Sequence, residues 1–265
     1  MATKKYQFAI YEKRDRIAYV TLNRPQVMNA LHPAAHDELA DIFADFRGDD
    51  ELWVAILTGA GERAFSAGRD LKQLAVHGEA HATSVDSIRP GGGWAIVNRF
   101  ECWKPLIAAV NGFALGGGFE MALACDIIIA AEHARFGLPE PTVGRMAGSG
   151  VHRLPRQLPL KVAMGYLLTG KHMTSQEALR WGLVNQVVPL RELLPTAERW
   201  AQEIMSCAPL SVRATKEAAM RGLSMPLDQA LNHQFYQSLL MGRSEDIVEG
   251  PKAFAEKRRP VWKGR

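Results

Sequence analysis

Two glutamates, Glu120 and Glu140, could act together in acid/base chemistry, because both lie in a largely apolar part of the sequence. Glu120 follows three consecutive glycines at 116–118. Glu140 stands between Pro139 and Pro141, which predicts a stiff loop rather than a helix at this position. An ordinary solvated glutamate is the alternative for each residue. Neither has a lysine or arginine at helical spacing, which favours the chemical role.

The glycines before Glu120 need an explanation, because three in succession are poor helix formers. They follow an apolar run at 106–110, which has the length of a buried strand, and they precede a helical pattern at 119–124. A helix start without side chains lets a ligand approach backbone N–H groups, which suit a developing negative charge. A second donor site is predicted at 65–71, where a turn of small residues leads into a helix start with Asp70 in its first turn.

Other elements must bring these segments together. The sequence predicts a hairpin at 7–22, a helix at 33–46 and buried strands at 52–58 and 127–131. Strands separated by helices imply parallel pairing through crossover connections, so we expect an α/β fold. Beyond residue 158 the pattern is mostly helical, with Thr174 as an N-cap. Helices are predicted there at 162–168, 175–181, 194–205, 209–221, 226–241 and 245–257, with a strand-like segment at 183–188.

A change in composition near residue 190 predicts two regions. Residues 1–190 form the core with the active site, and residues 191–265 form a C-terminal helical region. The helical region carries apolar positions that need a surface to cover, namely Leu227, Ala230, Leu231, Phe235 and Leu239.

Composition excludes several classes of protein. The formal net charge of +4 is too small and too scattered to indicate nucleic-acid binding. The excess of positive charge near the C-terminus indicates a solvated tail or, alternatively, attraction for a phosphate-bearing ligand. Cys102 and Cys125 are predicted to be buried free thiols rather than disulfides or metal ligands. No apolar run has transmembrane length and no signal segment is present, so we expect a cytoplasmic protein with no membrane partner.

Other motifs that could carry chemistry are weak. Neither Ser66 nor Ser149 lies in a G-x-S-x-G sequence, which argues against a serine hydrolase. The polar segment at 77–93 holds two histidines without an acidic residue suited to a metal pair, and it is predicted to be a loop near the site. His152 could be a catalytic acid, although a structural hydrogen bond is the favoured alternative. Trp94, on a helix predicted at 94–103, and Phe119 could line an apolar pocket or pack in the core.

Three ordered motifs resemble the crotonase superfamily, the enoyl-CoA hydratase/isomerase family. They are AFSAGRDL at 64–71, AAVNGFALGGGFEMALACD at 108–126 and FGLPE at 136–140. The similarity extends from LNRPQVMNAL at 22–31 to the tail FAEKRRPVWKGR. It implies a crotonase-like ββα superhelix of stacked parallel sheets with flanking helices, followed by a C-terminal helical trimerisation region. A homotrimer or a dimer of trimers is therefore expected.

The resemblance also implies roles for individual residues. The N–H groups of Arg69 and Gly117 match the family's oxyanion hole, Glu120 would activate water, and Glu140 would transfer a proton at the α-carbon. No metal and no separate cofactor is expected, because the acyl-CoA thioester substrate carries coenzyme A. Lys257, of the same or a neighbouring subunit, would meet a CoA phosphate, or it is a surface lysine. The residues expected to flank the CoA thioester arm are Ala67, Gly68, Asp70, Leu71 and Lys72.

Retention of both glutamates favours a hydratase or the reverse dehydratase, because isomerases of the family generally keep only the carboxylate that matches Glu140. We therefore expect an enoyl-CoA hydratase that adds water to a 2-enoyl-CoA thioester, with a role in fatty-acid β-oxidation. Two departures concern the acyl pocket: Arg69 replaces a small residue, and GRMA at 144–147 replaces a small-Ile-Pro sequence. The tail and ALRWGLVNQVV resemble carnitinyl-CoA dehydratases, which are the alternative. Another acyl-CoA lyase or isomerase and a non-catalytic acyl-CoA-binding protein also stay open.

Overall fold

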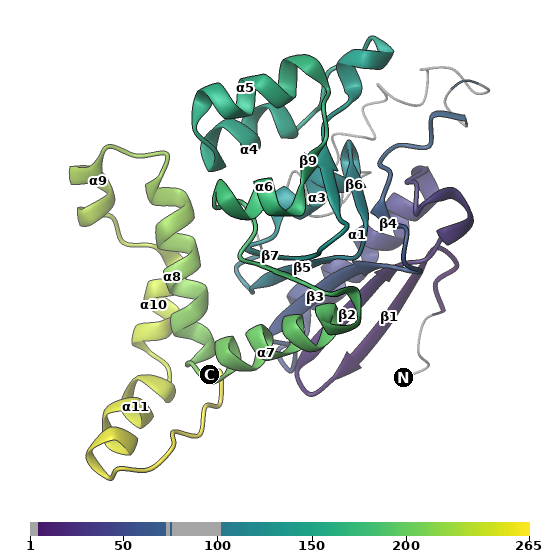
Figure 1. Ribbon diagram of the computed structural model, residues 1–265. Helices are drawn as coiled ribbons and strands as arrows, with labels where there is room; N and C mark the ends of the chain where they lie inside the picture. Colours follow the sequence, from purple (N-terminus) through teal and green to yellow (C-terminus); the bar gives the residue numbers. More distant parts are fainter. Residues whose placement is uncertain (1–4, 73–74, 76–101) are drawn as a thin grey trace.

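The computed structural model describes residues 5–72, 75 and 102–265 (Figure 1). The loop predicted at 77–93, with His77 and His81, and Trp94 lie outside the described residues. Of the helix predicted at 94–103, Cys102 and Trp103 are described and are not helical. No helix of the described part is long and apolar enough to cross a membrane.

A six-stranded sheet forms the first layer of the core. Its strand order is β1-β2-β3-β5-β7-β10. β1 and β2 form the predicted antiparallel hairpin, and Asp15 and Arg16 turn it with φ values of 50° and 67°. All other pairs are parallel, as the alternation of strands and helices predicted. The strands are β1 (Ala9–Arg14), β2 (Ile17–Leu22), β3 (Val54–Gly59), β5 (Leu106–Val110), β7 (Ile127–Ala131) and β10 (Gln186–Val188).

Three strands of the large sheet, β3, β5 and β7, are each followed along the chain by a strand of a second, smaller sheet. Its order is β4-β6-β8-β9, and β4, β6 and β8 are parallel neighbours. The carboxyl ends of parallel neighbours meet at the same edge of a sheet. The segments that follow β4, β6 and β8, which carry Arg69, Gly117 and Glu140, are thereby brought to one edge. The strands are β4 (Ala64–Ser66), β6 (Phe113–Leu115), β8 (Arg135–Gly137) and β9 (Met173–Thr174).

Helices surround the two sheets (Figure 1). α1 packs on the large sheet through buried residues that include Phe43 and Phe46, and Phe119 of α3 packs on Phe136 of β8 with ring centroids 5.4 Å apart. Phe119 is therefore a core residue. Thr174 forms the predicted N-cap, in a capping box with Glu177. The helices are α1 (Pro33–Gly48), α3 (Gly117–Ala124), α4 (Gly150–Gln157), α5 (Leu160–Thr169) and α6 (Ser175–Arg180).

The C-terminal helices divide into one that covers the large sheet and four that extend from it (Figure 1). α7 (Leu193–Met205) packs against β3, β5 and β7. The prediction of a single helix at 226–241 is wrong, because the structure has two helices there, separated by residues 233–235. Leu227 and Leu231 are 74% and 77% exposed. The extending helices are α8 (Pro209–Gly222), α9 (Leu227–Asn232), α10 (Tyr236–Gly242) and α11 (Asp246–Ala255).

Candidate active site

A cavity of about 290 Å³ lies at the edge where β4, β6 and β8 end. Both glutamates singled out in the sequence line it, together with the two residues expected to supply N–H donors. The structure thus brings six of the predicted site residues to one cavity, because Ala67 and Leu71 line it as well. The lining residues are Ala67, Arg69, Leu71, Gly116, Gly117, Glu120, Pro139, Glu140, Thr142, Val143, Arg145, Met146 and Gly148.

The loop after β4 is held against residues 28–31 by a parallel bridge between Leu31 and Arg69. The N–H of Leu31 donates to the carbonyl of Gly68 at 2.7 Å, and the N–H of Asp70 donates to the carbonyl of Leu31 at 2.9 Å. In a parallel bridge the peptide groups on either side of the central residue bond to the partner, and the N–H of the central residue points away from it. The peptide N–H of Arg69 therefore faces away from Leu31, on the side of the loop where Arg69 lines the cavity.

The glycines after β6 allow two main-chain segments to lie in contact. Gly116 precedes α3 with φ 52° and ψ −127°, a conformation that is essentially restricted to glycine. A Cβ atom at Gly118 would lie 2.2 Å from the carbonyl oxygen of Ser66, and one at Gly68 would lie 2.8 Å from the nitrogen of Gly117. The start of α3, with the N–H of Gly117, therefore packs directly on the loop that carries Arg69.

A buried polar network fixes this loop. Ser66 is fully buried, and its hydroxyl donates to the carbonyl of Asn29 at 2.8 Å and accepts the N–H of Gly68 at 3.1 Å. The side chain of Asn29 donates in turn to the carbonyl of Ala64 at 2.8 Å. The hydroxyl of Ser66 is thus used internally, which agrees with the prediction against a serine nucleophile. No local sequence pattern indicated this network, because its members join segments far apart in the chain.

Glu120 is 2% exposed, and its Oε1 accepts the N–H of Gly150 at 2.7 Å. It lies in the first turn of α3, one turn after the N–H of Gly117. Its carboxylate is thus oriented by the start of α4 while it lines the cavity. The sequence did not predict α4, because Gly150 and Pro155 within it are poor helix formers.

Glu140 begins a short 3-10 helix, η4 (Glu140–Val143), so the predicted plain loop is corrected to one tight turn. Its Oε2 is buried and has no hydrogen-bond partner among the described residues, and its Oε1 lies beside Gly116. Burial raises the pKa of Glu140 above its ordinary value of 4.5, the nearby Glu120 adds to this effect, and Arg145 opposes it. The two acids are therefore close enough for Glu120 to influence Glu140, which retains its proton to higher pH than an ordinary glutamate.

Glu140→Gln is expected to stabilise the folded protein increasingly as pH rises above about 4.5. A carboxyl with a raised pKa binds more proton in the folded chain than in the unfolded chain, so its contribution to stability falls as pH rises through this window. Urea unfolding of the wild type and the variant at several pH values measures the difference. A difference in unfolding free energy that stays constant from pH 4 to neutral pH would contradict the expectation.

Only some of the residues expected to flank the CoA arm line the cavity. Ala67 and Leu71 line the cavity, and Gly68 supports the loop behind it. The carboxylate of Asp70 pairs with Arg24 at 3.2 Å, with both side chains largely buried, so it serves the loop from inside. Lys72 is exposed and does not line the cavity.

Lys257 lies just beyond α11, which extends away from the sheets, and it is not brought to the cavity within one chain (Figure 1). His152 is exposed and also does not line the cavity. The sequence analysis did not assign Pro139, Thr142, Val143 and Gly148 to the site, whereas Met146 belongs to the segment at 144–147 that it placed near the acyl pocket. Their proximity to Glu140 along the chain was the available signal.

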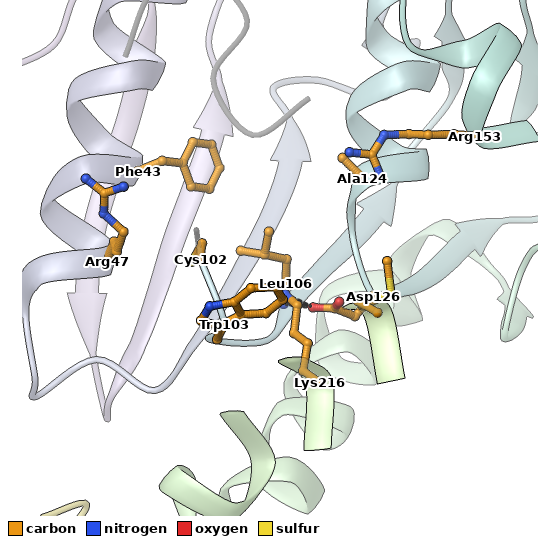
Figure 2. Close-up of a pocket in the computed structure, with 10 residues that line it drawn as sticks. Phe43, Arg47, Cys102, Trp103, Leu106, Ala124, Asp126, Arg153 and Lys216 are labelled. Atoms are coloured by element: carbon orange, nitrogen blue, oxygen red, sulfur yellow. Dashed lines mark hydrogen bonds and ion pairs between the residues drawn. The ribbon is translucent and has the colours of Figure 1, made fainter. Parts of the chain in front are cut away.

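A second, smaller hollow of about 40 Å³ lies at the other end of α3, where α8 meets the core (Figure 2). Lys216 of α8 reaches Asp126 at 2.7 Å and also donates to the carbonyl of Lys104. The hollow has room for only a few water molecules, about 10–15 Å³ being needed for each. The contacts of Lys216 fasten α8 to the core, and the hollow beside them is too small to be a site for a thioester. No cluster of three or more potential metal ligands occurs among the described residues.

Comparisons with known proteins show which proteins the chain is similar to. The family model described as enoyl-CoA hydratase/isomerase matches residues 12–265. The chain is 46% identical to (E)-benzylidenesuccinyl-CoA hydratase of Thauera aromatica, over 96% of this chain and 98% of that protein. It is also 46% identical to carnitinyl-CoA dehydratase of Escherichia coli K12, over 94% of this chain and 95% of that protein.

Solved structures of enoyl-CoA hydratases are also similar to this chain. The enoyl-CoA hydratase of Mycobacterium tuberculosis H37Rv superposes with a TM-score of 0.88 and 40% identity, over 97% of this chain and 99% of that one. The enoyl-CoA hydratase of Bacillus anthracis superposes with a TM-score of 0.90 and 37% identity, over 98% of this chain and all of that one. The resemblance seen in the three sequence motifs and the fold it implied are thereby confirmed.

Proposed function

Because the chain belongs to the enoyl-CoA hydratase/isomerase family, and is a hydro-lyase like the relatives it matches, we propose that it is an enoyl-CoA hydratase. It adds water reversibly to the double bond of a 2-enoyl-CoA thioester and gives a 3-hydroxyacyl-CoA. The observation that carries this proposal is the convergence of two carboxyl groups and two main-chain donors on one cavity.

The thioester carbonyl binds between the N–H groups of Arg69 and Gly117. As water attacks the β-carbon, negative charge grows on the thioester oxygen, and these two donors stabilise the enolate. A helix start is suited to this task, because its first N–H groups have no partner within the helix. The contact between the two donor segments supports a single shared oxyanion site.

The acids complete the reaction. Glu120, as a carboxylate held by the N–H of Gly150, takes a proton from the attacking water. Glu140, as the acid whose pKa is raised, gives a proton to the α-carbon of the enolate. One proton enters Glu120 and one leaves Glu140, so the pair returns to its starting state by exchange of a proton between them or with solvent.

The oligomer is part of the proposal. The exposed apolar side chains of the helices after α7, among them Leu227 and Leu231, suit burial between subunits of a homotrimer or a dimer of trimers. In such an assembly Lys257 of a neighbouring subunit meets a CoA phosphate, since Lys257 does not line the cavity of its own chain. A CoA arm that lies along Leu71 and Lys72 is consistent with the exposure of both side chains.

Carnitinyl-CoA dehydratase is the second candidate, favoured by the identity of 46% to enzymes of that name. Its acyl chain carries a quaternary ammonium group, which aromatic side chains bind best. None of the described residues that line the cavity is aromatic. The described part of the site therefore supports the general hydratase more than this alternative.

A hydration assay tests the proposal. Loss of the conjugated absorbance of crotonyl-CoA is expected on addition of the protein, and the product should be 3-hydroxybutyryl-CoA. Hydration only of crotonobetainyl-CoA would favour the carnitinyl alternative. Tight binding of acyl-CoA esters without turnover of any enoyl-CoA would instead support a non-catalytic acyl-CoA-binding protein.

A further inference from the structure

Arg145 occupies a fixed place directly after the turn that carries Glu140. η4 ends at Gly144, which has φ 70°, and the N–H of Arg145 donates to the carbonyl of Glu140 at 2.9 Å. Arg145 is partly buried and lines the cavity. Its guanidinium lies near enough to the Glu140 carboxyl to oppose the rise in that group's pKa.

The position of Arg145 relative to a bound substrate follows from the proposed function. If the thioester oxygen lies between the N–H groups of Arg69 and Gly117, the reacting carbons lie beside Glu120 and Glu140. Among the described residues, the wall that remains for the rest of the acyl chain is formed by residues 142–148. Arg145 therefore faces the part of the acyl chain beyond the double bond.

Among the described residues 142–148 of this wall, Arg145 is the one with a charged side chain. Val143 and Met146 are apolar and are 53% and 72% exposed, and the hydroxyl of Thr142 already donates to the carbonyl of Pro139 at 2.7 Å. The other arginine of the cavity, Arg69, lies close enough to the buried His36 of α1 to help lower its pKa to about 4, an effect due mainly to burial.

We propose, on the basis of the function proposed above, that Arg145 selects acyl chains that carry a carboxylate beyond the double bond. The planar guanidinium can bind a carboxylate through two parallel hydrogen bonds, which give both affinity and orientation. The flanking Val143 and Met146 contact the methylene groups of such a chain. A cationic acyl chain would be repelled at the same place.

A pair of saturated CoA esters of equal chain length tests this selection without turnover. Adipoyl-CoA ends in a carboxylate and hexanoyl-CoA in a methyl group, and calorimetry gives the dissociation constant of each. The wild type is expected to bind adipoyl-CoA roughly 10- to 100-fold more tightly. Arg145→Gln should reduce this ratio to about one, and Arg145→Lys should retain part of it. Arg191→Gln, which removes a surface cation that is 85% exposed, should leave the ratio unchanged.

Three results would overturn the inference: equal or weaker binding of adipoyl-CoA by the wild type, an unchanged ratio in Arg145→Gln, or equal losses for both esters. Equal losses of affinity for both esters, together with a shifted pH profile of hydration, would show that Arg145 acts only on Glu140. The α,β-unsaturated forms of the two esters test the proposed function separately. If the unsaturated uncharged ester is hydrated but the protein binds both esters equally well, the selection by Arg145 is refuted. The proposed hydratase function then still stands.

Discussion

Replacement of Glu120 or Glu140 by glutamine is expected to lower kcat for hydration of crotonyl-CoA by roughly 10²–10⁴-fold, the usual contribution of a positioned acid or base. Both carboxyls line one cavity, and neither exchange alters the volume of the side chain. Glutamine can still accept the N–H of Gly150 at position 120, so the fold should persist. KM should change little, because the CoA arm binds elsewhere.

Kinetics of the double variant sharpen this test. If the two acids serve one reaction, the double variant should be about as slow as the slower single variant, because residues that act as a unit are not additive. Glu192→Gln is the matched control, since Glu192 lies on the surface in η5 (Leu190–Glu192). A Glu120→Gln or Glu140→Gln enzyme that turns over as fast as the wild type would exclude the mechanism.

Gly68→Ala is expected to lower kcat/KM by roughly 10²–10³-fold through loss of the oxyanion site, since removal of one donor costs about 2.7–4 kcal/mol. The new Cβ atom would lie 2.5 Å from the carbonyl oxygen of Leu115 and 2.8 Å from the nitrogen of Gly117. These are backbone atoms, so the two donor segments must separate. Stopped-flow hydration of crotonyl-CoA, with circular dichroism to verify folding, provides the measurement.

Gly182→Ala separates this effect from backbone strain. Gly182 has φ 75°, close to the 79° of Gly68, but a Cβ atom there has open space within 4 Å. Both alanines therefore impose similar left-handed strain, which costs of order 1–3 kcal/mol. The control should lose stability and keep its activity. Equal loss of activity in both variants would disprove a specific role for the contact at Gly68.

Much of the large sheet could be predicted from sequence, because its central strands β3, β5 and β7 are mostly apolar runs. The predicted bounds 106–110 and 127–131 coincide with β5 and β7. The strands of the small sheet were missed, because β4, β6 and β8 have three residues each and show no periodicity. Yet these short strands bring the site together. Their pairing depends on contacts between distant segments, which local patterns do not reveal.

The error at 226–241 has a similar origin. Leu227, Leu231 and Phe235 fit the spacing of one helix, but the chain turns before Phe235 so that α10 packs on α8. Glu217 of α8, which is buried, accepts the N–H of Gln237 at the start of α10 at 2.7 Å. This tertiary contact satisfies a helix end that a continuous helix would not have.

The candidate site was predictable as far as the family motifs extend. Glu120, Glu140, Arg69 and Gly117 were singled out from the sequence, and all four line the cavity. The pairing of Asp70 with Arg24 was not foreseen, because the two residues are far apart in the chain. Residues that position a loop from behind leave no local signature.

The two walls of the cavity differ in a way that affects how the enzyme can diverge. One wall offers main-chain N–H groups, whose presence does not depend on side-chain identity, whereas Val143, Arg145 and Met146 on the other wall present side chains. Mutational libraries confined to these three positions should therefore yield catalysts with new substrate ranges and an intact turnover machinery.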